Sequence, residues 1–142
     1  MPWIALLNTN VTTSTQEGIY VVFLIATDLN RIFLTLNQGT TNLVNDLGQR
    51  EAQKRMIDVA NKTRLLISDL AAAGFVLDSK ISLGGGGWLA KNYEIGTIAH
   101  MDFDVNDLPS DERMNELLKA VLDAYDRAVD VPPPEPTTPD EE

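Results

Sequence analysis

The pattern of apolar and polar residues predicts three strands near the start of the chain. Residues 3–7 (WIALL) form a short apolar run, and residues 19–25 (IYVVFLI) are apolar on both faces, as in the central strand of a sheet. In residues 31–36 (RIFLTL), every second side chain is aliphatic. A turn at residues 27–30 separates the last two runs, so we expect them to pair as a hairpin.

Two later segments have the periodicity of amphipathic helices. Within residues 45–72, one face at 100° per residue is formed by Ala52, Met56, Val59, Ala60, Thr63, Ile67 and Leu70. Gly74 is expected to end this helix. A second helix is predicted after Ser110, a good N-cap residue that is followed by acidic residues. Its apolar stripe is formed by Met114, Leu117, Leu118, Val121, Leu122, Tyr125 and Val129.

The order of these elements predicts the fold class. Residues 84–88 (GGGGW) are predicted to be a loop, and residues 93–103 a further strand. We therefore expect an α+β domain over residues 1–130, with a mixed, mainly antiparallel sheet and two main amphipathic helices on one side of it. The chain starts inside the first strand, which we interpret as a domain that lacks its N-terminal part. Residues 131–142 (VPPPEPTTPDEE) contain five prolines and four acids, which predicts a disordered linker or tail.

Composition and charge restrict the function classes. The 142 residues include no cysteine, which excludes disulfides, thiolate zinc sites and cysteine nucleophiles. The net charge is −10, but residues 31–91 carry eight basic and five acidic side chains, whereas residues 102–142 carry three basic and thirteen acidic ones. The longest apolar run is eight residues, which is far too short for a membrane span. These features favour a soluble, cytoplasmic protein.

The motifs that could support catalysis are incomplete. The glycine run 84–87 lacks the lysine and hydroxyl residue of a phosphate-binding loop. His100, Asp102 and Asp104 alternate and could share the face of a strand as metal ligands, but a solvated strand edge is the favoured interpretation. We therefore expect a protein that is not an enzyme and needs no cofactor.

Binding is the better interpretation of the remaining residues. The longer predicted helix has a basic face, which fits either a solvated surface or contact with nucleic acid: Arg50, Lys54, Arg55, Lys62 and Arg64. The strand aromatics Trp3 and Tyr20 fit a core position, whereas Trp88 in a glycine loop is harder to explain by packing. The residues alone thus indicate a binding domain.

Five segments together resemble a known family. They are residues 2–7 (PWIALL), 18–24 (GIYVVFL), 31–41 (RIFLTLNQGTT), 92–99 (NYEIGTIA) and 107–110 (DLPS). The chain from residue 2 to about 129 resembles the N-terminal domain of McrB-like proteins, which is also classed as a domain of unknown function. The stretch LNQGTT is the most specific element of this resemblance.

The resemblance implies a DNA-recognition module of a modification-dependent (type IV) restriction system, which serves in antiviral defence. In the best-known member of that family, the domain binds methylated cytosine in DNA and flips the base into a pocket. The implied partners are DNA, an AAA+ GTPase motor and a separate nuclease subunit, without a membrane. Base flipping needs apolar and aromatic pocket walls and phosphate contacts.

The resemblance also implies site residues. Trp3, Tyr20 and Leu24 correspond to pocket walls, and Trp88 to the pocket rim. The expected contacts with the DNA backbone are Asn37, Gln38, Thr40, Thr41 and Lys91.

A different function class stays open at this point. The acidic residues between positions 102 and 142 could bind a basic partner or mimic DNA. In that case the chain would be a non-catalytic protein-interaction or assembly domain with an acidic C-terminal face.

Overall fold

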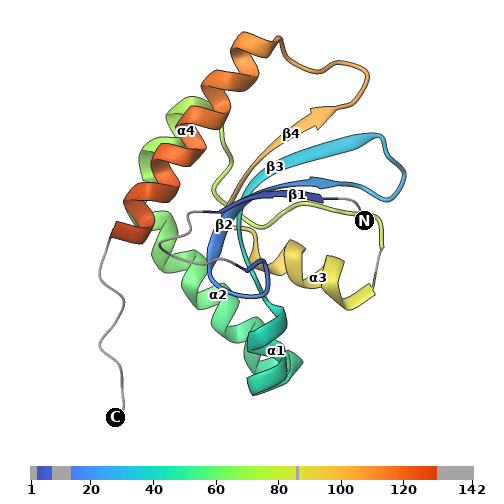
Figure 1. The fold of residues 1–142 in the computed structure, drawn as a ribbon, viewed down its shortest axis with the longest axis vertical. Coiled ribbons are helices and arrows are strands. Elements are labelled where there is room, and N and C mark those ends of the chain that lie inside the picture. The colour runs from blue at the N-terminus through green and yellow to red at the C-terminus, as the bar shows by residue number, and fades with distance from the viewer. Residues whose placement is uncertain (1–2, 8–13, 86, 131–142) are drawn as a thin grey trace.

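The computed structural model describes residues 3–7, 14–85 and 87–130 (Figure 1). The elements in chain order are β1 (Trp3–Leu6), β2 (Ile19–Ile25), β3 (Arg31–Gln38), α1 (Thr41–Leu47), α2 (Gln49–Leu66), the 3₁₀ helix η1 (Ser68–Ala73), α3 (Gly87–Gly96), β4 (Ala99–Asp104) and α4 (Asp111–Asp130). The tail predicted for residues 131–142 lies outside the described residues. No helix of the described part is long and apolar enough to cross a membrane.

The described strands form one antiparallel sheet in the order β1-β2-β3-β4. The predicted hairpin is confirmed as β2 and β3, which pair from Ile19 with Gln38 to Ile25 with Ile32. Both central strands are largely buried. This agrees with the apolar character of β2 on both faces, whereas β3 also buries the polar side chains of Thr35, Asn37 and Gln38. The α+β class predicted from the order of elements is confirmed.

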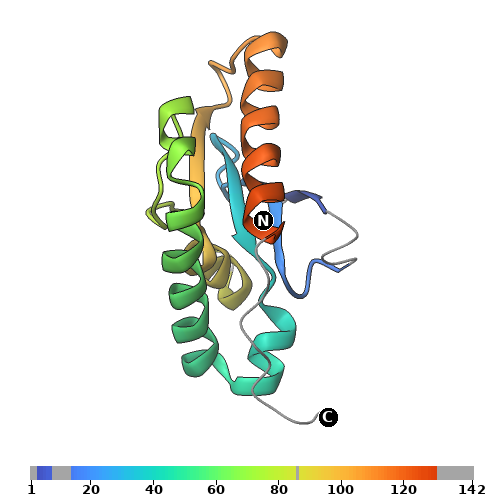
Figure 2. The same ribbon diagram turned by 90° about the vertical axis from the view of Figure 1, so that its left-hand side faces the viewer.

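Helices cover both faces of this sheet. Tyr20 and Asn37 are cross-strand partners, and both contact Tyr93 of α3 on one face. Figure 2 shows α2, η1 and α4 on the near side of the sheet and α3 beyond it. The two predicted amphipathic helices therefore lie on one side of the sheet, as expected, but the other face is covered by α3. This third helix was not expected, because the segment that forms α3 was predicted to be loop and strand.

The helix predicted for residues 45–72 is three elements instead of one. The backbone turns at Gly48, whose φ of 80° ends α1 and precedes α2. A second break follows Leu66, and Ile67 has a non-helical backbone before η1 begins. The predicted apolar face nevertheless points inward, because Ala52, Met56, Ala60, Thr63, Ile67 and Leu70 are all buried.

The strand predicted for residues 93–103 is wrong in its first half. Residues 93–96 complete α3, and β4 starts only at Ala99. Over so few residues, an alternating pattern and a helical pattern select several of the same positions. Ala90 and Tyr93, three residues apart, are both buried and form the inner side of α3.

The C-terminal helix forms as predicted. The backbone N–H of Arg113 donates to the Ser110 hydroxyl at 3.1 Å, which confirms the expected cap before α4. Leu117, Val121 and Tyr125 of the predicted stripe are fully or almost fully buried. Because α4 contacts β2, β3 and η1, its apolar side completes the core.

Candidate nucleic-acid interface

The three predicted pocket walls lie on the same face of the sheet. Trp3 on the edge strand β1 is opposite Leu24 in the register, and Tyr20 lies on the same side of β2. Trp3 is 41% exposed, whereas Tyr20 and Leu24 are completely buried. Only the Trp3 indole is therefore accessible to a ligand in this conformation, and the other two side chains pack beneath the surface.

The Tyr20 hydroxyl belongs to a buried hydrogen-bond pair. It donates to the carbonyl oxygen of Thr15 at 2.8 Å, which leaves the Tyr93 hydroxyl, 2.7 Å away, to donate to Tyr20. Burial, strengthened by the contact with Tyr93, raises the pKa of Tyr20. Both tyrosines are therefore neutral, and the pair joins β2 to α3.

Trp88 and Lys91 form the accessible part of α3. The structure places Trp88 in the first turn of α3 and not in a loop, which corrects the sequence-based prediction. Its side chain is 51% exposed, and Lys91 is also exposed. Residues three apart on a helix are neighbours, so the indole and the ammonium group lie on the same side of α3.

Asn37 and Gln38 lie in the core with their amide donors engaged. The Asn37 Nδ2 donates to the Tyr93 carbonyl and to the Thr97 hydroxyl, each at 3.1 Å. The Gln38 Nε2 donates to the carbonyls of Met56 and Gly96 at 2.9 and 3.1 Å. Contact between these amides and a DNA backbone would require these bonds to break.

The two predicted threonine contacts lie beside this buried network. Thr40 is 3% exposed and stands at the N-cap position of α1, where its side chain makes no capping bond. Thr41 begins α1 and is half-buried. The structure therefore brings Trp88 and Lys91 to one accessible surface and places Asn37, Gln38 and Thr40 inside the fold.

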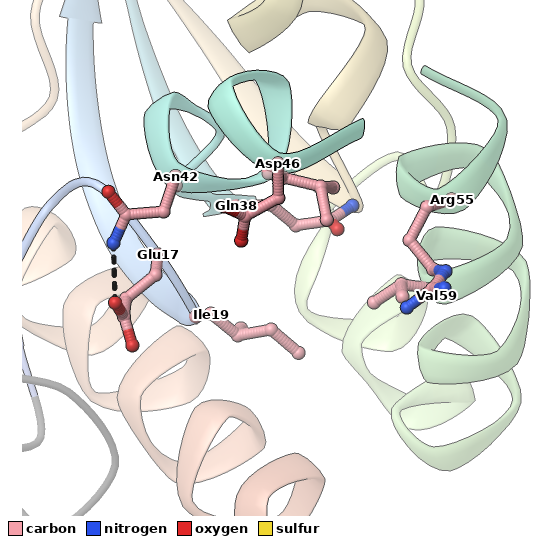
Figure 3. A pocket seen from close by; sticks show the side chains of 10 residues that line it. Glu17, Ile19, Gln38, Asn42, Asp46, Arg55 and Val59 are labelled. Atoms are coloured by element: carbon pink, nitrogen blue, oxygen red, sulfur yellow. Dashed lines mark hydrogen bonds between the residues drawn. The ribbon is translucent and has the colours of Figure 1, made fainter. Parts of the chain in front are cut away.

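A pocket of about 350 Å³ opens between α1, α2 and the adjoining ends of β2 and β3 (Figure 3). On one wall, the Asn42 amide donates to the Glu17 carboxylate at 2.5 Å, and Arg55 stands on the opposite wall. Ile19 and Val59 contribute apolar surface. The pocket contains none of the predicted aromatic residues, and its walls suit a small group that carries both hydrogen-bond donors and acceptors.

The basic face of α2 is partly neutralised by the helix itself. Lys54 pairs with Glu51 at 3.4 Å, and Lys62 pairs with Asp58 at 3.0 Å. Arg64 instead donates from Nε and Nη2 to two backbone carbonyls at residues 97–98. Burial lowers the pKa of Arg64, although Asp78 opposes this. The exposed ion pairs of Lys54 and Lys62 favour a solvated surface for this face of α2.

His100 is buried between two aspartates and is not at a solvated strand edge. Its Nε2 lies 2.7 Å from Asp78 and its Nδ1 2.5 Å from Asp102. Asp104 does not join them, because its carboxylate accepts the backbone N–H of Asn106. The predicted metal alternative therefore lacks support, and the described residues contain no cluster of three or more groups placed to hold a metal ion.

One comparison with known proteins identifies the family. The family described as MrcB-like, N-terminal domain, matches residues 1–130. The chain belongs to this family. No curated protein sequence and no solved structure matches the chain significantly. Membership in the MrcB-like family supports a DNA-binding module of a McrB-type restriction system, which associates with other restriction subunits.

The MrcB-like domain contains two important side chains that sequence reasoning missed. Tyr93 is central to the contact between β2 and α3, and the spacing of Ala90 and Tyr93 was the available signal for its inward position. Asp78 is 22 positions from His100, and no pattern in the sequence connects the two.

Proposed function

We propose that this MrcB-like domain binds DNA in a cytoplasmic restriction system and reads a modified cytosine by base flipping. The match of the family to residues 1–130 is the observation that carries the proposal. The domain itself is non-catalytic and delivers DNA to an AAA+ GTPase motor and a nuclease subunit.

The exposed indoles supply the stacking surface in this proposal. A flipped base loses its stacking in the duplex and needs an aromatic or apolar surface to replace it. Trp3 and Trp88 offer such surfaces, and the buried Leu24 and Tyr20 support the face on which Trp3 lies. Lys91, next to Trp88, is suited to a phosphate contact that holds the strand.

The distribution of charge is compatible with DNA at this side of the molecule. Helix α4 lies on the opposite face of the sheet from α3. It carries the exposed acidic residues Asp111, Glu112, Glu116, Asp123 and Asp126. DNA that approaches α3 and β1 therefore has the sheet between itself and this acidic helix. Repulsion from these charges is also screened over roughly 10 Å at 0.1 M salt.

Binding of short duplexes with and without 5-methylcytosine, measured by fluorescence anisotropy at low salt, tests the proposal. We expect the methylated duplex to bind more tightly, and Trp3→Ala to weaken that binding. Loss of one base–aromatic stack corresponds to about 1–3 kcal/mol, or roughly 5- to 150-fold in Kd. Ile4→Ala is the matched control, since Ile4 is the next residue on β1 and is 62% exposed but not aromatic.

Two further variants separate base contacts from phosphate contacts. Lys91→Ala should weaken binding to both duplexes equally, because a phosphate contact carries no sequence information. Lys119→Ala is its control, because Lys119 lies on α4 and pairs with Asp123. Absence of binding to either duplex at low salt would contradict the proposal and favour a protein-interaction domain that uses the acidic helix.

A further inference from the structure

The carboxylates of Asp78 and Asp102, each partly exposed, and the buried imidazole of His100 form a bridge at the edge of the sheet. His100 and Asp102 belong to β4, whereas Asp78 belongs to the connecting segment that follows η1, residues 74–85. His100 is only 4% exposed. Neither the antiparallel pairing of the sheet nor the proposed DNA contacts requires an ionisable side chain at this place.

The bridge fastens the start of the connecting segment to the sheet. Val76 and His100 exchange two backbone hydrogen bonds, of 2.8 and 2.9 Å, which add an isolated β-bridge at the free edge of β4. The Asp78 carboxylate then holds the His100 ring two residues further along. Phe75, Ile81 and Leu83 are buried on either side of Asp78, so the segment lies against the core.

The end of the same segment is fastened to α3. The backbone N–H of Leu83 donates to the Glu94 carboxylate at 2.8 Å, and Glu94 belongs to α3. The Thr27 hydroxyl donates to the Gly84 carbonyl at 2.9 Å, which holds the segment beside the turn that follows β2. The segment is therefore held at Asp78 and again at Leu83 and Gly84, and the bond from Leu83 to Glu94 links it directly to α3, the helix that carries Trp88.

We propose that the Asp78–His100–Asp102 bridge positions the exposed end of α3, with Trp88 and Lys91, for binding. His100 is a positioning residue in this proposal, since it touches no ligand. The effect on DNA affinity rests on the function proposed above, whereas the effect on Trp88 and on the connecting segment does not.

The bridge requires a doubly protonated imidazole. Only the imidazolium form donates from both ring nitrogens, so a neutral ring presents a lone pair to one of the two carboxylates. The charged groups around the ring are Asp78 and Lys80 of the connecting segment, Asp102 of β4 and, through its attraction to Asp78, Arg64 of α2. Burial opposes protonation, but the bonds to Asp102 and Asp78 raise the pKa of His100 overall.

The pH dependence follows from this shift. A pKa raised above 6.5 in the folded protein means that the bridge is complete at lower pH and is lost as the pH rises through the raised value. We therefore expect the connecting segment and α3 to loosen as the pH rises through the raised pKa of His100.

Trp88 fluorescence tests the proposal without DNA. In a Trp3→Phe background, Trp88 is the remaining tryptophan, and its emission should change with a midpoint above pH 6.5 between pH 6 and 9. Asp102→Asn keeps the side-chain shape but removes one charge that favours the imidazolium, so the midpoint should move to lower pH. Asp104→Asn is the matched control, because Asp104 lies on the same strand and does not contact the ring. An unchanged midpoint in Asp102→Asn would overturn the proposal.

Hydrogen exchange and DNA titration complete the test. The amides of residues 76–85 should lose protection with the same midpoint, relative to the amides of β2, and His100→Gln should remove this pH dependence. DNA affinity should fall with the same midpoint in the wild type and move with it in Asp102→Asn. If the Trp88 fluorescence changes at this midpoint but the DNA affinity does not, the link between the bridge and DNA binding is overturned. Absence of DNA binding at every pH removes the proposed function but leaves the fluorescence and exchange results as the test of positioning.

Discussion

Replacement of Asn37 by alanine separates a structural role from a role in DNA contact. Asn37 is fully buried, and its side chain donates to the Tyr93 carbonyl and the Thr97 hydroxyl while its Oδ1 accepts the backbone N–H of Gln38 at 2.8 Å. A DNA-contact role predicts weaker binding with unchanged stability. The structure predicts instead that the replacement causes a large loss of stability.

The magnitude follows from the bonds that are lost. Each hydrogen bond contributes about 0.5–1.5 kcal/mol net, and a buried donor without an acceptor costs about 1–3 kcal/mol. The Tyr93 carbonyl still accepts the Thr97 hydroxyl at 2.7 Å in the variant, so the Gln38 N–H is the main unsatisfied group. We expect Asn37→Ala to lower the free energy of unfolding by about 2–4 kcal/mol.

Urea denaturation followed by circular dichroism measures this change. Asn45→Ala is the matched control, because Asn45 is exposed on α1 and alanine favours the helix, and it should change the free energy of unfolding by less than about 0.5 kcal/mol. Unfolding of Asn37→Ala at the same urea concentration as the wild type would contradict a structural role for this side chain. If Asn37→Ala were as stable as the wild type but had lost DNA affinity, Asn37 would instead be a DNA contact.

Three further predictions concern the fold. Gly39→Ala should destabilise the protein severely in thermal unfolding, because a Cβ there would collide with backbone atoms of residues 15–17, which cannot move aside as the end of a side chain can. Ser110→Ala should cost about 1 kcal/mol in urea unfolding through loss of the cap to Arg113, and an unchanged midpoint would contradict the capping role. The stability advantage of the wild type over His100→Gln should be full below pH 6.5 and decline as the pH rises through the raised pKa of His100; urea titrations at pH 6, 7.5 and 9 would contradict this if the difference were constant.

Local patterns were sufficient for the elements whose periodicity is long and uninterrupted. The hairpin of β2 and β3 and the amphipathic α4 with its Ser110 cap follow directly from the order of residues. The helix after β3 was predicted too long, because its apolar face continues past Leu66 to the buried Ile67 and Leu70, although the α-helical backbone does not. The periodicity of apolar residues therefore predicts which side chains are buried more accurately than it predicts the residues at which a helix begins and ends.

The candidate site was less predictable, because accessibility depends on tertiary packing. Trp3 and Tyr20 both lie on strands and have similar local sequences, yet one is exposed on the edge strand and the other is covered by α3. Asn37 resembled a polar turn residue because its burial depends on a helix about 50 residues later in the chain. The contact between Asp78 and His100 could not be predicted either, because the two residues are 22 positions apart and meet only in the folded chain.

Competition between methylated and unmethylated duplexes of the same sequence measures whether the domain distinguishes a modified cytosine. A labelled methylated duplex bound to the wild-type domain at low salt is displaced by each unlabelled duplex in turn, and the same titration is run with Trp3→Ala and Ile4→Ala. We expect the methylated competitor to displace the label at a lower concentration, Trp3→Ala to remove this preference and Ile4→Ala to retain it. Equal displacement by both duplexes, or a preference that survives in Trp3→Ala, would contradict this expectation.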